Sequence, residues 1–275
     1  MLDIPEQRRR YHLVAALLLS TAMVLLVYIV DTSAQRYRAT NQTLLSLSNI
    51  DPISIFPDFS IIEDVDVKKQ LFFDFLQDYV DAENRRMLVW RELLENSGSP
   101  ALEGLTLSAP ERKTVDEIAA YFRLETEGLS EREIVAELTL RVDTIPPSLV
   151  LSQAANESAW GTSRFTLQGN NIFGQWCYVE GCGIVPARRV AGATHEVQSF
   201  DSVAESVESY FLNINTNDVY SYLRELRKQM RDLGLSFDSM ALALGLGRYS
   251  ERGDNYVDEI QNIIIQNNLK DRDGL

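Results

Sequence analysis

Metal-binding residues are scarce in this sequence. Among its 275 residues are only two cysteines and two histidines. Cys177 and Cys182 have only His195 near them, and no set of four ligands with the spacing of a zinc site is present. We therefore expect no metal site and no cofactor.

Positive charge is also scarce. The 26 Lys and Arg residues stand against 40 Asp and Glu residues, which gives a formal net charge of -14. A chain with this balance lacks the basic surface that neutralises phosphates, so a nucleic-acid partner is excluded. A polyanionic ligand would have to be held by specific contacts in a cleft rather than by overall charge.

Internal repeats and low-complexity tracts are absent. With 45% hydrophobic and 24% charged residues, the chain is too apolar for general disorder. Its length leaves room for one medium-sized domain with extensions.

One long apolar run without charge is present, at residues 13–30. Its length is close to the minimum for a membrane-spanning helix, and three arginines before it favour a cytoplasmic N-terminus. We therefore predict a cytoplasmic tail at 1–12, a single-pass inner-membrane anchor at 13–30 and a periplasmic linker at 31–64. The alternative is a signal peptide, cleaved among the small residues at 32–34, which would release the protein into the periplasm.

The two cysteines fit an exported protein, because disulfides form and persist in an oxidising compartment. Cys177 and Cys182 are separated by a short segment that can form a tight loop, and we predict a disulfide between them. So short a loop adds modest stability, but the bridge would make the segment rigid.

Apolar residues recur at three- and four-residue spacing over much of the chain, which predicts a mainly α protein. A first helix is predicted from Val65 to about Asn96, where a Ser-Gly-Ser-Pro sequence ends it. Two further helices begin with capping-box patterns at Ser108 and Ser130. These helices form a predicted helical extension at 65–143, with their aromatic residues in the core.

Residues 144–275 form a second predicted domain. Residues 176–198 are Gly-rich and mixed in character, and they predict short strands or a loop lobe. Around this small β element, helices are predicted at 202–212, 219–233, 238–246 and 255–268.

The stretch from Pro147 to Gly174 carries the most chemical information. It begins as a helix, because proline fits at a first helical position without loss, and small and apolar residues fall on one of its faces. Glu157 lies near the end of this helix, one turn before Trp160, and Gly161 is the expected C-cap. Partial burial beside the tryptophan would raise the pKa of the Glu157 carboxyl, as a general acid for glycoside cleavage requires.

Two motifs in this stretch, AANESAWG at residues 154–161 and GNNIFG at residues 169–174, resemble the glucosaminidase family of peptidoglycan hydrolases. That family carries an AxxESxWG helix followed by an N-[LIV]-FG turn. A closer resemblance, to a membrane-associated member, includes the segments GQWC, GCG, ATHEV and GRYSERG and runs from about Phe56 to the C-terminus. It implies that residues 144–275 are a glucosaminidase catalytic domain with a mainly α, α+β lysozyme-like fold.

The resemblance also implies a function. It indicates an endo-β-N-acetylglucosaminidase that acts on peptidoglycan glycan strands, at the β-1,4 bond between N-acetylglucosamine (GlcNAc) and N-acetylmuramic acid (MurNAc). Glu157 is the implied general acid. The sequence predicts no particular protein partner, and it leaves exo action open.

Two further catalytic residues are implied by the resemblance. Glu196 matches the family's TxE position in the β lobe. It is either the base that activates water, which would imply inversion, or it is dispensable because the 2-acetamido group of GlcNAc assists the reaction. Tyr249 matches the first tyrosine of the family's YATDPxY segment, which lines the cleft near the acid, although SERGDN replaces ATDPN here.

Four residues are candidates for substrate binding: Trp160, Asn171, Phe173 and Trp176. Asn171 and Phe173 belong to the NxFG turn, which the resemblance places at the floor of the cleft, and Phe173 is equally compatible with the core. Trp176 follows the turn and could either stack on a sugar or anchor a lid.

Three other functions remain open on the sequence. A lytic transglycosylase uses one glutamate on the same fold and leaves an anhydro end on its product. A cell-wall amidase would use Cys177 and His195. A non-catalytic wall-binding scaffold would have kept the fold, and the altered segment after Tyr249 is compatible with it.

Overall fold

The computed structural model of the protein describes residues 20–23, 25, 53–187, 189 and 192–274. The chain divides into two units, Met1–Ser46 and Leu47–Leu275, and the helices and strands with assigned bounds lie in the second. The predicted cytoplasmic tail and most of the predicted anchor and linker fall outside the described residues. Within the described ranges, no helix is long and apolar enough to cross a membrane.

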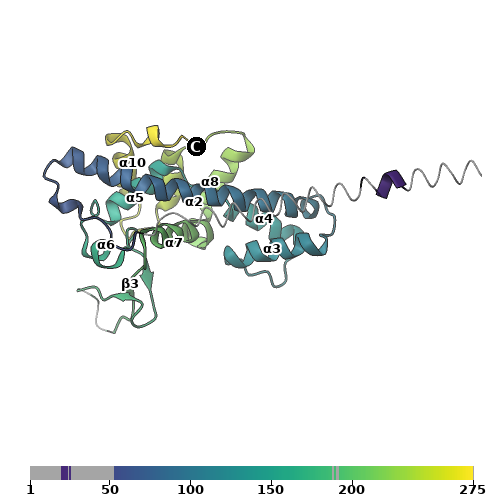
Figure 1. Cartoon of the computed structure of the whole chain (residues 1–275), viewed down its shortest axis with the longest axis horizontal. Coiled ribbons are helices and arrows are strands. Elements are labelled where there is room, and N and C mark those ends of the chain that lie inside the picture. Colours follow the sequence, from purple (N-terminus) through teal and green to yellow (C-terminus); the bar gives the residue numbers. More distant parts are fainter. Residues whose placement is uncertain (1–19, 24, 26–52, 188, 190–191, 275) are drawn as a thin grey trace, which may run out of the picture. The chain divides into compact units, whose positions relative to one another are not determined.

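The second unit is mainly helical, as predicted, and carries one small sheet (Figure 1). Its helices are, in chain order, η1 (Phe59–Ile61), α2 (Val65–Leu102), α3 (Ala109–Tyr121), α4 (Glu131–Arg141), α5 (Pro147–Glu157), α6 (Arg164–Gly169), α7 (Val203–Thr216), η2 (Asp218–Tyr220), α8 (Ser221–Asp232), α9 (Ser239–Ala243), η3 (Leu244–Leu246), α10 (Asp254–Gln266) and η4 (Leu269–Arg272). The short helix α6 was not predicted.

The sheet has three short antiparallel strands in the order β1-β3-β2. They are β1 (Trp176–Cys177), β2 (Gly183–Ile184) and β3 (Glu196–Gln198). Cys177 pairs with Glu196 in the register of β1 and β3. Figure 1 shows this sheet as a small lobe at the edge of the helical body, in the segment where the sequence predicted short strands or a loop lobe.

The long helix α2 packs against α3, α4, α5 and α7. Its predicted end near Asn96 is wrong, because the helix continues through Pro100 to Leu102. A proline in the last turn removes only one amide donor. Gly98 serves close packing, since a Cβ atom there would lie 2.7 Å from Cγ1 of Val135 in α4.

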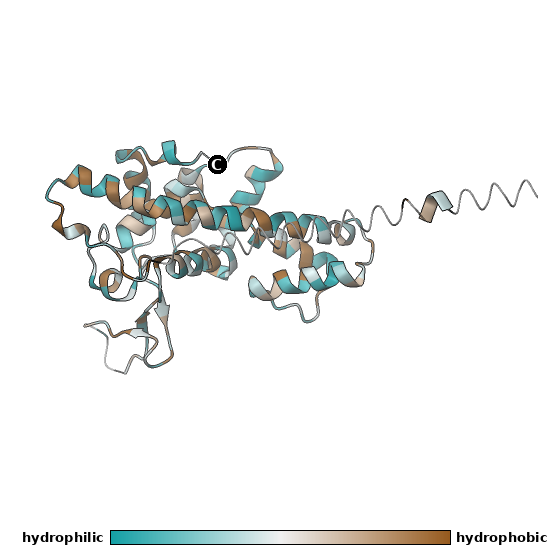
Figure 2. Ribbon diagram, viewed as in Figure 1, coloured by the Kyte–Doolittle hydropathy of each residue, from teal (hydrophilic) through white to brown (hydrophobic). Residues whose placement is uncertain are grey.

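An aromatic cluster joins the start of α2 to the loop after α5. The rings of Phe56, Phe59 and Phe72 lie around Gly161, and a Cβ atom at this glycine would come within 2.8 Å of Phe56. The Trp160 ring lies 6.1 Å from that of Phe72, edge to face. Figure 2 shows the same end of α2 as one of the more hydrophobic parts of the molecule.

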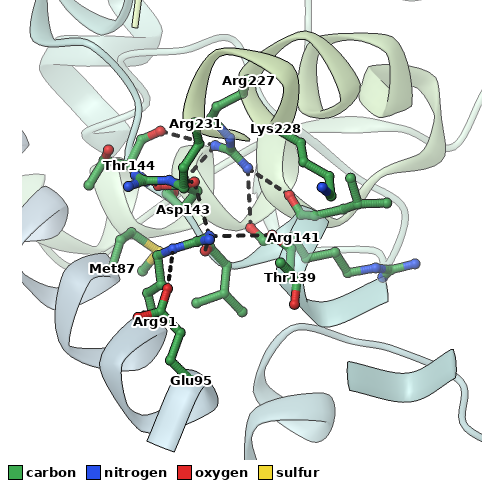
Figure 3. A network of polar contacts seen from close by, with 12 residues as sticks. Met87, Arg91, Glu95, Thr139, Arg141, Asp143, Thr144, Arg227, Lys228 and Arg231 are labelled. Atoms are coloured by element: carbon green, nitrogen blue, oxygen red, sulfur yellow. Dashed lines mark hydrogen bonds and ion pairs between the residues drawn. The ribbon is translucent and has the colours of Figure 1, made fainter. Parts of the chain in front are cut away.

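A buried charge network joins α2 and α4 to α8 (Figure 3). Asp143 has a side chain that is 3% exposed and forms ion pairs with Arg91 and Arg231. Arg227 is 1% exposed and donates to the side chain of Asn215 and to the carbonyls of Leu140, Arg141, Asp143 and Thr144. Each buried charge therefore has partners, as its desolvation requires.

The predicted boundary at residue 143 does not divide the structure into compact parts. Residues from Leu47 to Leu275 form one unit, and α2 of the predicted extension packs on α5 and α7 of the predicted catalytic domain. Whether the boundary separates two functional parts stays a prediction.

Candidate active site

The helix α5 carries Glu157 as its last residue. Its residues from Pro147 to Ala155 are buried, so the helix runs through the core. Its N-cap, Pro146, has no capping side chain. The carboxylate of Asp273 supplies the cap from the end of the chain, accepting from the backbone N–H of Ser148 at 2.8 Å and from its hydroxyl at 2.7 Å.

The backbone after Glu157 turns through an unusual conformation. Ser158 is the C-cap, and Ala159, Trp160 and Gly161 all have left-handed backbones, with φ of 50°, 60° and 77°. The predicted cap at Gly161 is therefore wrong, because the helix ends earlier. Left-handed non-glycine residues cost about 1–2 kcal/mol each, and such strained positions cluster at functional sites.

The Glu157 carboxyl is half-buried beside the NxFG turn. A Cβ atom at Gly174 (φ +65°) would lie 3.4 Å from Oε2 of Glu157. Burial raises the pKa of Glu157, while a hydrogen bond with Tyr256 and the charge of Arg252 lower it. The carboxyl is thus partly desolvated and lies close to a glycine of the NxFG turn.

Asn171 and Phe173 hold the NxFG turn in place. The Asn171 side chain donates to the carbonyls of Gln175 and Gln198, both at 2.8 Å, and accepts from the Gln175 N–H at 3.0 Å. Phe173 stacks on Tyr210, with centroids 4.1 Å apart. Both residues are 1% exposed, which is the core position that the sequence left open for Phe173, and a substrate-binding role for either residue stays a prediction.

Tyr249 lies beside this turn and supports it. Its hydroxyl donates to the carbonyl of Phe173 at 2.8 Å, and its ring stacks on Tyr256 with centroids 5.4 Å apart. Burial raises its pKa well above the ordinary value, so the hydroxyl is a neutral donor. The structure thus places Tyr249 near the acid, bonded to the turn.

Tyr256 is a site residue that the sequence analysis missed. It is 0% exposed, and its hydroxyl group is one of the neighbours that lower the pKa of Glu157. The signal in the sequence was Gln153, a polar residue one turn before Glu157 on a small and apolar helix. Gln153 donates to the Tyr256 hydroxyl at 2.9 Å.

The altered segment SERGDN brings a charge to the site. Its Arg252 forms an ion pair with Glu259 at 3.2 Å and lies 5.3 Å from the ring centre of Tyr256. The two residues have opposite effects on the pKa of Glu157: Arg252 lowers it and Glu259 raises it.

The Glu196 side chain is hydrogen-bonded to the backbone of the disulfide loop. Its carboxylate accepts from the backbone N–H groups of Gly181 at 3.2 Å and Gly183 at 2.9 Å, and the residue is 4% exposed. The disulfide between Cys177 and Cys182 closes the same loop, as predicted. A catalytic role for Glu196 stays a prediction, and it would require these hydrogen bonds to break.

Trp160 and Trp176 lie in different surroundings. The Trp160 ring belongs to the aromatic cluster, 5.4 Å from Phe73 and with Nζ of Lys69 5.0 Å above it. Trp176 is 54% exposed and stacks on His195, with centroids 4.3 Å apart and an interplanar angle of 9°. Trp176 is therefore the predicted substrate-binding residue whose ring is open to a ligand.

The amidase alternative fails on this geometry. Cys177 is bonded to Cys182, so it has no thiol to act as nucleophile. His195 stacks on Trp176. Among the described residues, no group of His, Cys, Asp and Glu could hold a metal ion.

Comparison with known proteins supports the family. The model of the Glucosaminidase family, described as mannosyl-glycoprotein endo-beta-N-acetylglucosaminidase, matches residues 134–269. The chain is also similar to Protein bax of Escherichia coli (strain K12), with 30% identity over 208 residues, which cover 74% of this chain and 71% of that protein. No solved structure matches the chain. By these two matches, and by the motifs around Glu157, the chain belongs to the glucosaminidase family and has a glycosidase-type domain.

Proposed function

We propose that the protein is a peptidoglycan hydrolase, an N-acetylglucosaminidase that cleaves the β-1,4 bond between GlcNAc and MurNAc. The observation that carries this proposal is the Glu157 carboxyl. It is half-buried, its pKa is raised by burial, and it lies beside Gly174 of the NxFG turn. A carboxyl of this kind can keep a proton near neutral pH and deliver it to a glycosidic oxygen.

In the proposed reaction, Glu157 gives its proton to the leaving oxygen as the bond from that oxygen to the anomeric carbon breaks. Positive charge develops on the sugar ring in the transition state. Glu157 then holds a negative charge, which the Tyr256 hydroxyl and Arg252 stabilise, since both lower its pKa. The same carboxylate can accept a proton from the water that completes hydrolysis.

The geometry favours assistance by the substrate over a second protein carboxylate. Glu196 is the predicted second carboxylate, and both of its oxygens accept backbone hydrogen bonds. The 2-acetamido oxygen of GlcNAc can attack the anomeric carbon instead, a known exception to the two-carboxylate rule. Water then opens the cyclic intermediate, with overall retention at that carbon.

We assign the exposed ring of Trp176 to glycan binding. A flat, exposed aromatic ring offers an apolar surface on which the face of a sugar can pack. His195 stacks behind it, and the disulfide fixes the adjacent loop. Such a contact uses no charge, which suits a protein with a net charge of -14.

The test is to digest purified peptidoglycan with the full-length protein and its Glu157→Gln variant, and to identify the new ends by mass spectrometry. We expect new GlcNAc reducing ends from the unmutated protein alone. Anhydro-MurNAc ends would instead identify a lytic transglycosylase. If neither protein cleaves but both bind peptidoglycan equally, the chain is a wall-binding scaffold.

We also propose that residues 13–30 anchor the protein in the inner membrane, with Leu47–Leu275 in the periplasm. The apolar run and the disulfide support this location. Membrane fractionation followed by N-terminal sequencing tests it. A membrane-bound chain with its original N-terminus is expected, whereas a chain that begins after residue 34 would identify a cleaved signal peptide.

A further inference from the structure

The segment that precedes α2, residues 53–59, contacts both loops that carry the motifs of the candidate site. We call this segment the strap. It lies outside residues 134–269, which the family model matches, so that match assigns it no role. Its two phenylalanines, Phe56 and Phe59, are only 2% and 5% exposed. The strap is therefore packed into the same compact unit as the site, although it is distant from the site in the sequence.

Asn170 joins the strap to the start of the NxFG turn. Its Oδ1 accepts from the backbone N–H of Phe56 at 3.2 Å, and its Nδ2 donates to the carbonyls of Ser54 at 2.9 Å and Phe200 at 3.0 Å. Asn170 has a left-handed backbone, with φ of 50°, a conformation that asparagine tolerates. Its amide therefore bonds three backbone groups, two of them in the strap, directly before Asn171 of the turn.

The two phenylalanines of the strap pack on the loop that follows Glu157. A Cβ atom at Gly161 would lie 2.8 Å from Phe56 and 2.9 Å from Phe59, so both rings lie against the backbone of this loop. Residues 159–161 are all left-handed there. Strained backbone of this kind persists only where the surrounding structure holds it in place. The strap supplies part of that surrounding structure.

We propose that the strap is a positioning element for Glu157, because it holds the loop after the acid and the NxFG turn in one fixed arrangement. The two meet at the carboxyl, where a Cβ atom at Gly174 of the turn would lie 3.4 Å from Oε2 of Glu157. Misplacing a catalytic group by about 1 Å can cost roughly 100-fold in rate. This inference rests on the proposed role of Glu157 as the acid, and it adds that activity requires a segment outside the family-matched residues.

A second buried phenylalanine separates positioning from stability. Phe122, at the end of α3, is 0% exposed, and its ring lies 6.3 Å from that of Trp90 and 5.1 Å from that of Tyr121. Truncating either Phe56 or Phe122 to alanine removes a buried ring from an aromatic cluster, which lowers stability. Only the truncation of Phe56 removes a contact with the loop that follows the acid.

The first test measures backbone hydrogen exchange of the full-length protein by mass spectrometry, under conditions in which every variant is folded. We expect Phe56→Ala to speed exchange roughly 10-fold or more in residues 158–163 and 169–175, because it loosens both loops. Phe122→Ala is the matched control, and it should leave exchange in these two segments unchanged.

The second test measures peptidoglycan cleavage by the same folded variants. Phe56→Ala should lower kcat by roughly 10- to 100-fold with a smaller change in KM, because it displaces the acid more than it weakens binding. Phe56→Leu, which restores an apolar side chain against the loop, should recover most of the lost kcat. Phe122→Ala should retain the kcat of the unmutated protein.

Unchanged exchange in the two segments of Phe56→Ala would overturn the proposal, as would equal effects in Phe122→Ala. An unchanged kcat despite faster exchange would also overturn it, because the strap would then hold the loops without positioning the acid. If Phe56→Ala does not fold, Asn170→Gly decides by the same measurements, since glycine suits the left-handed backbone and removes the side-chain bonds to the strap. If the unmutated protein cleaves nothing, the proposed function fails, while the exchange rates still test whether the strap holds the loops.

Discussion

At the scale of single residues, the proposed active site centres on a glutamate, Glu157, whose pKa depends on its neighbours. Burial is the largest influence on the pKa of Glu157 and raises it. A general acid works only while it is protonated, so activity should persist to higher pH than an ordinary glutamate would allow and should fall as the pH rises through the pKa of Glu157. A pH profile of kcat/KM that does not fall at alkaline pH would contradict the assignment of Glu157 as the general acid.

Two charged residues near Glu157 should shift the fall in activity at alkaline pH in opposite directions. Arg252 lowers the pKa of Glu157 and Glu259 raises it. We expect Arg252→Met to shift the alkaline limb to higher pH and Glu259→Gln to shift it to lower pH. Both side chains are about half exposed, at 48% and 42%, so the shifts should be small and should shrink with added salt.

Residue roles were only partly accessible from the sequence. The motif around Glu157 was clear, because its spacing matches a family pattern. The hydroxyl of Tyr256 was missed, because a tyrosine in an apolar helical pattern predicts burial but not the partner of its oxygen. Glu196 was predicted in the β lobe, but its hydrogen bonds with backbone N–H groups of the disulfide loop could not be predicted, because they depend on the loop conformation.

At the scale of elements, α5 depends on the end of the chain. Asp273 supplies the only side-chain cap that the described residues give to this helix, through Ser148. We expect Asp273→Ala to lower the free energy of unfolding by about 1–2 kcal/mol, measured by denaturant unfolding. Asp271→Ala is the control, since Asp271 is exposed, and an equal loss in that variant would contradict the cap.

A cluster of ion pairs between α2 and α7 contains a carboxyl group, that of Glu83, with a pKa near neutral. Glu83 of α2 shares Arg86 with Glu208 of α7, with Arg86 2.6 Å from Glu208. Burial raises the pKa of Glu83 from 4.5 to about 7, although Arg86 opposes the rise. Because the folded protein then holds a proton that the unfolded chain has released, stability should decline as the pH rises from about 4.5 through 7.

This decline should amount to at most about 3 kcal/mol. Denaturant unfolding at a series of pH values measures it. Glu83→Gln, which is neutral at every pH, should flatten the dependence, whereas Glu95→Gln, at an exposed position of the same helix, should preserve it. A dependence that survives in Glu83→Gln would place its origin elsewhere.

Element boundaries show why the sequence alone misplaced the end of α2. Gly98 and Pro100 predict a break, because both lower helix propensity. However, α4 packs so closely on Gly98 that a Cβ atom there would lie 2.7 Å from Val135. This tertiary contact is not part of helix propensity, so the sequence pattern could not predict it. The capping boxes at Ser108 and Ser130, by contrast, are local, and both helices begin where predicted.

At the scale of the whole molecule, the predicted extension and the predicted catalytic domain share one core. The Asp143 network ties α2, α4 and α8 together, and the aromatic cluster ties α2 to the loop after Glu157. We therefore expect residues 47–275 to unfold in a single cooperative transition. Residues 144–275 expressed alone should fail to fold, and a folded, cooperative fragment would contradict this account.

The buried network should be the most sensitive part of this shared core. Asp143→Asn leaves buried arginines without their counter-charge, and we expect it to lower the free energy of unfolding by about 3–5 kcal/mol. Asp78→Asn, at an exposed position of α2, should change it little. If the two variants had similar free energies of unfolding, the network would make no net contribution to stability.

The account rests most directly on Glu157 as the proton donor to the leaving oxygen. The measurement is the cleavage rate of the Glu157→Gln variant on peptidoglycan and on a dinitrophenyl β-chitobioside, whose leaving group departs without a proton. We predict a loss of about 100- to 10,000-fold on peptidoglycan and a much smaller loss on the aryl substrate, with Glu92→Gln unaffected on both. An equal loss on both substrates, or no loss on peptidoglycan, would contradict the assignment of Glu157 as the acid.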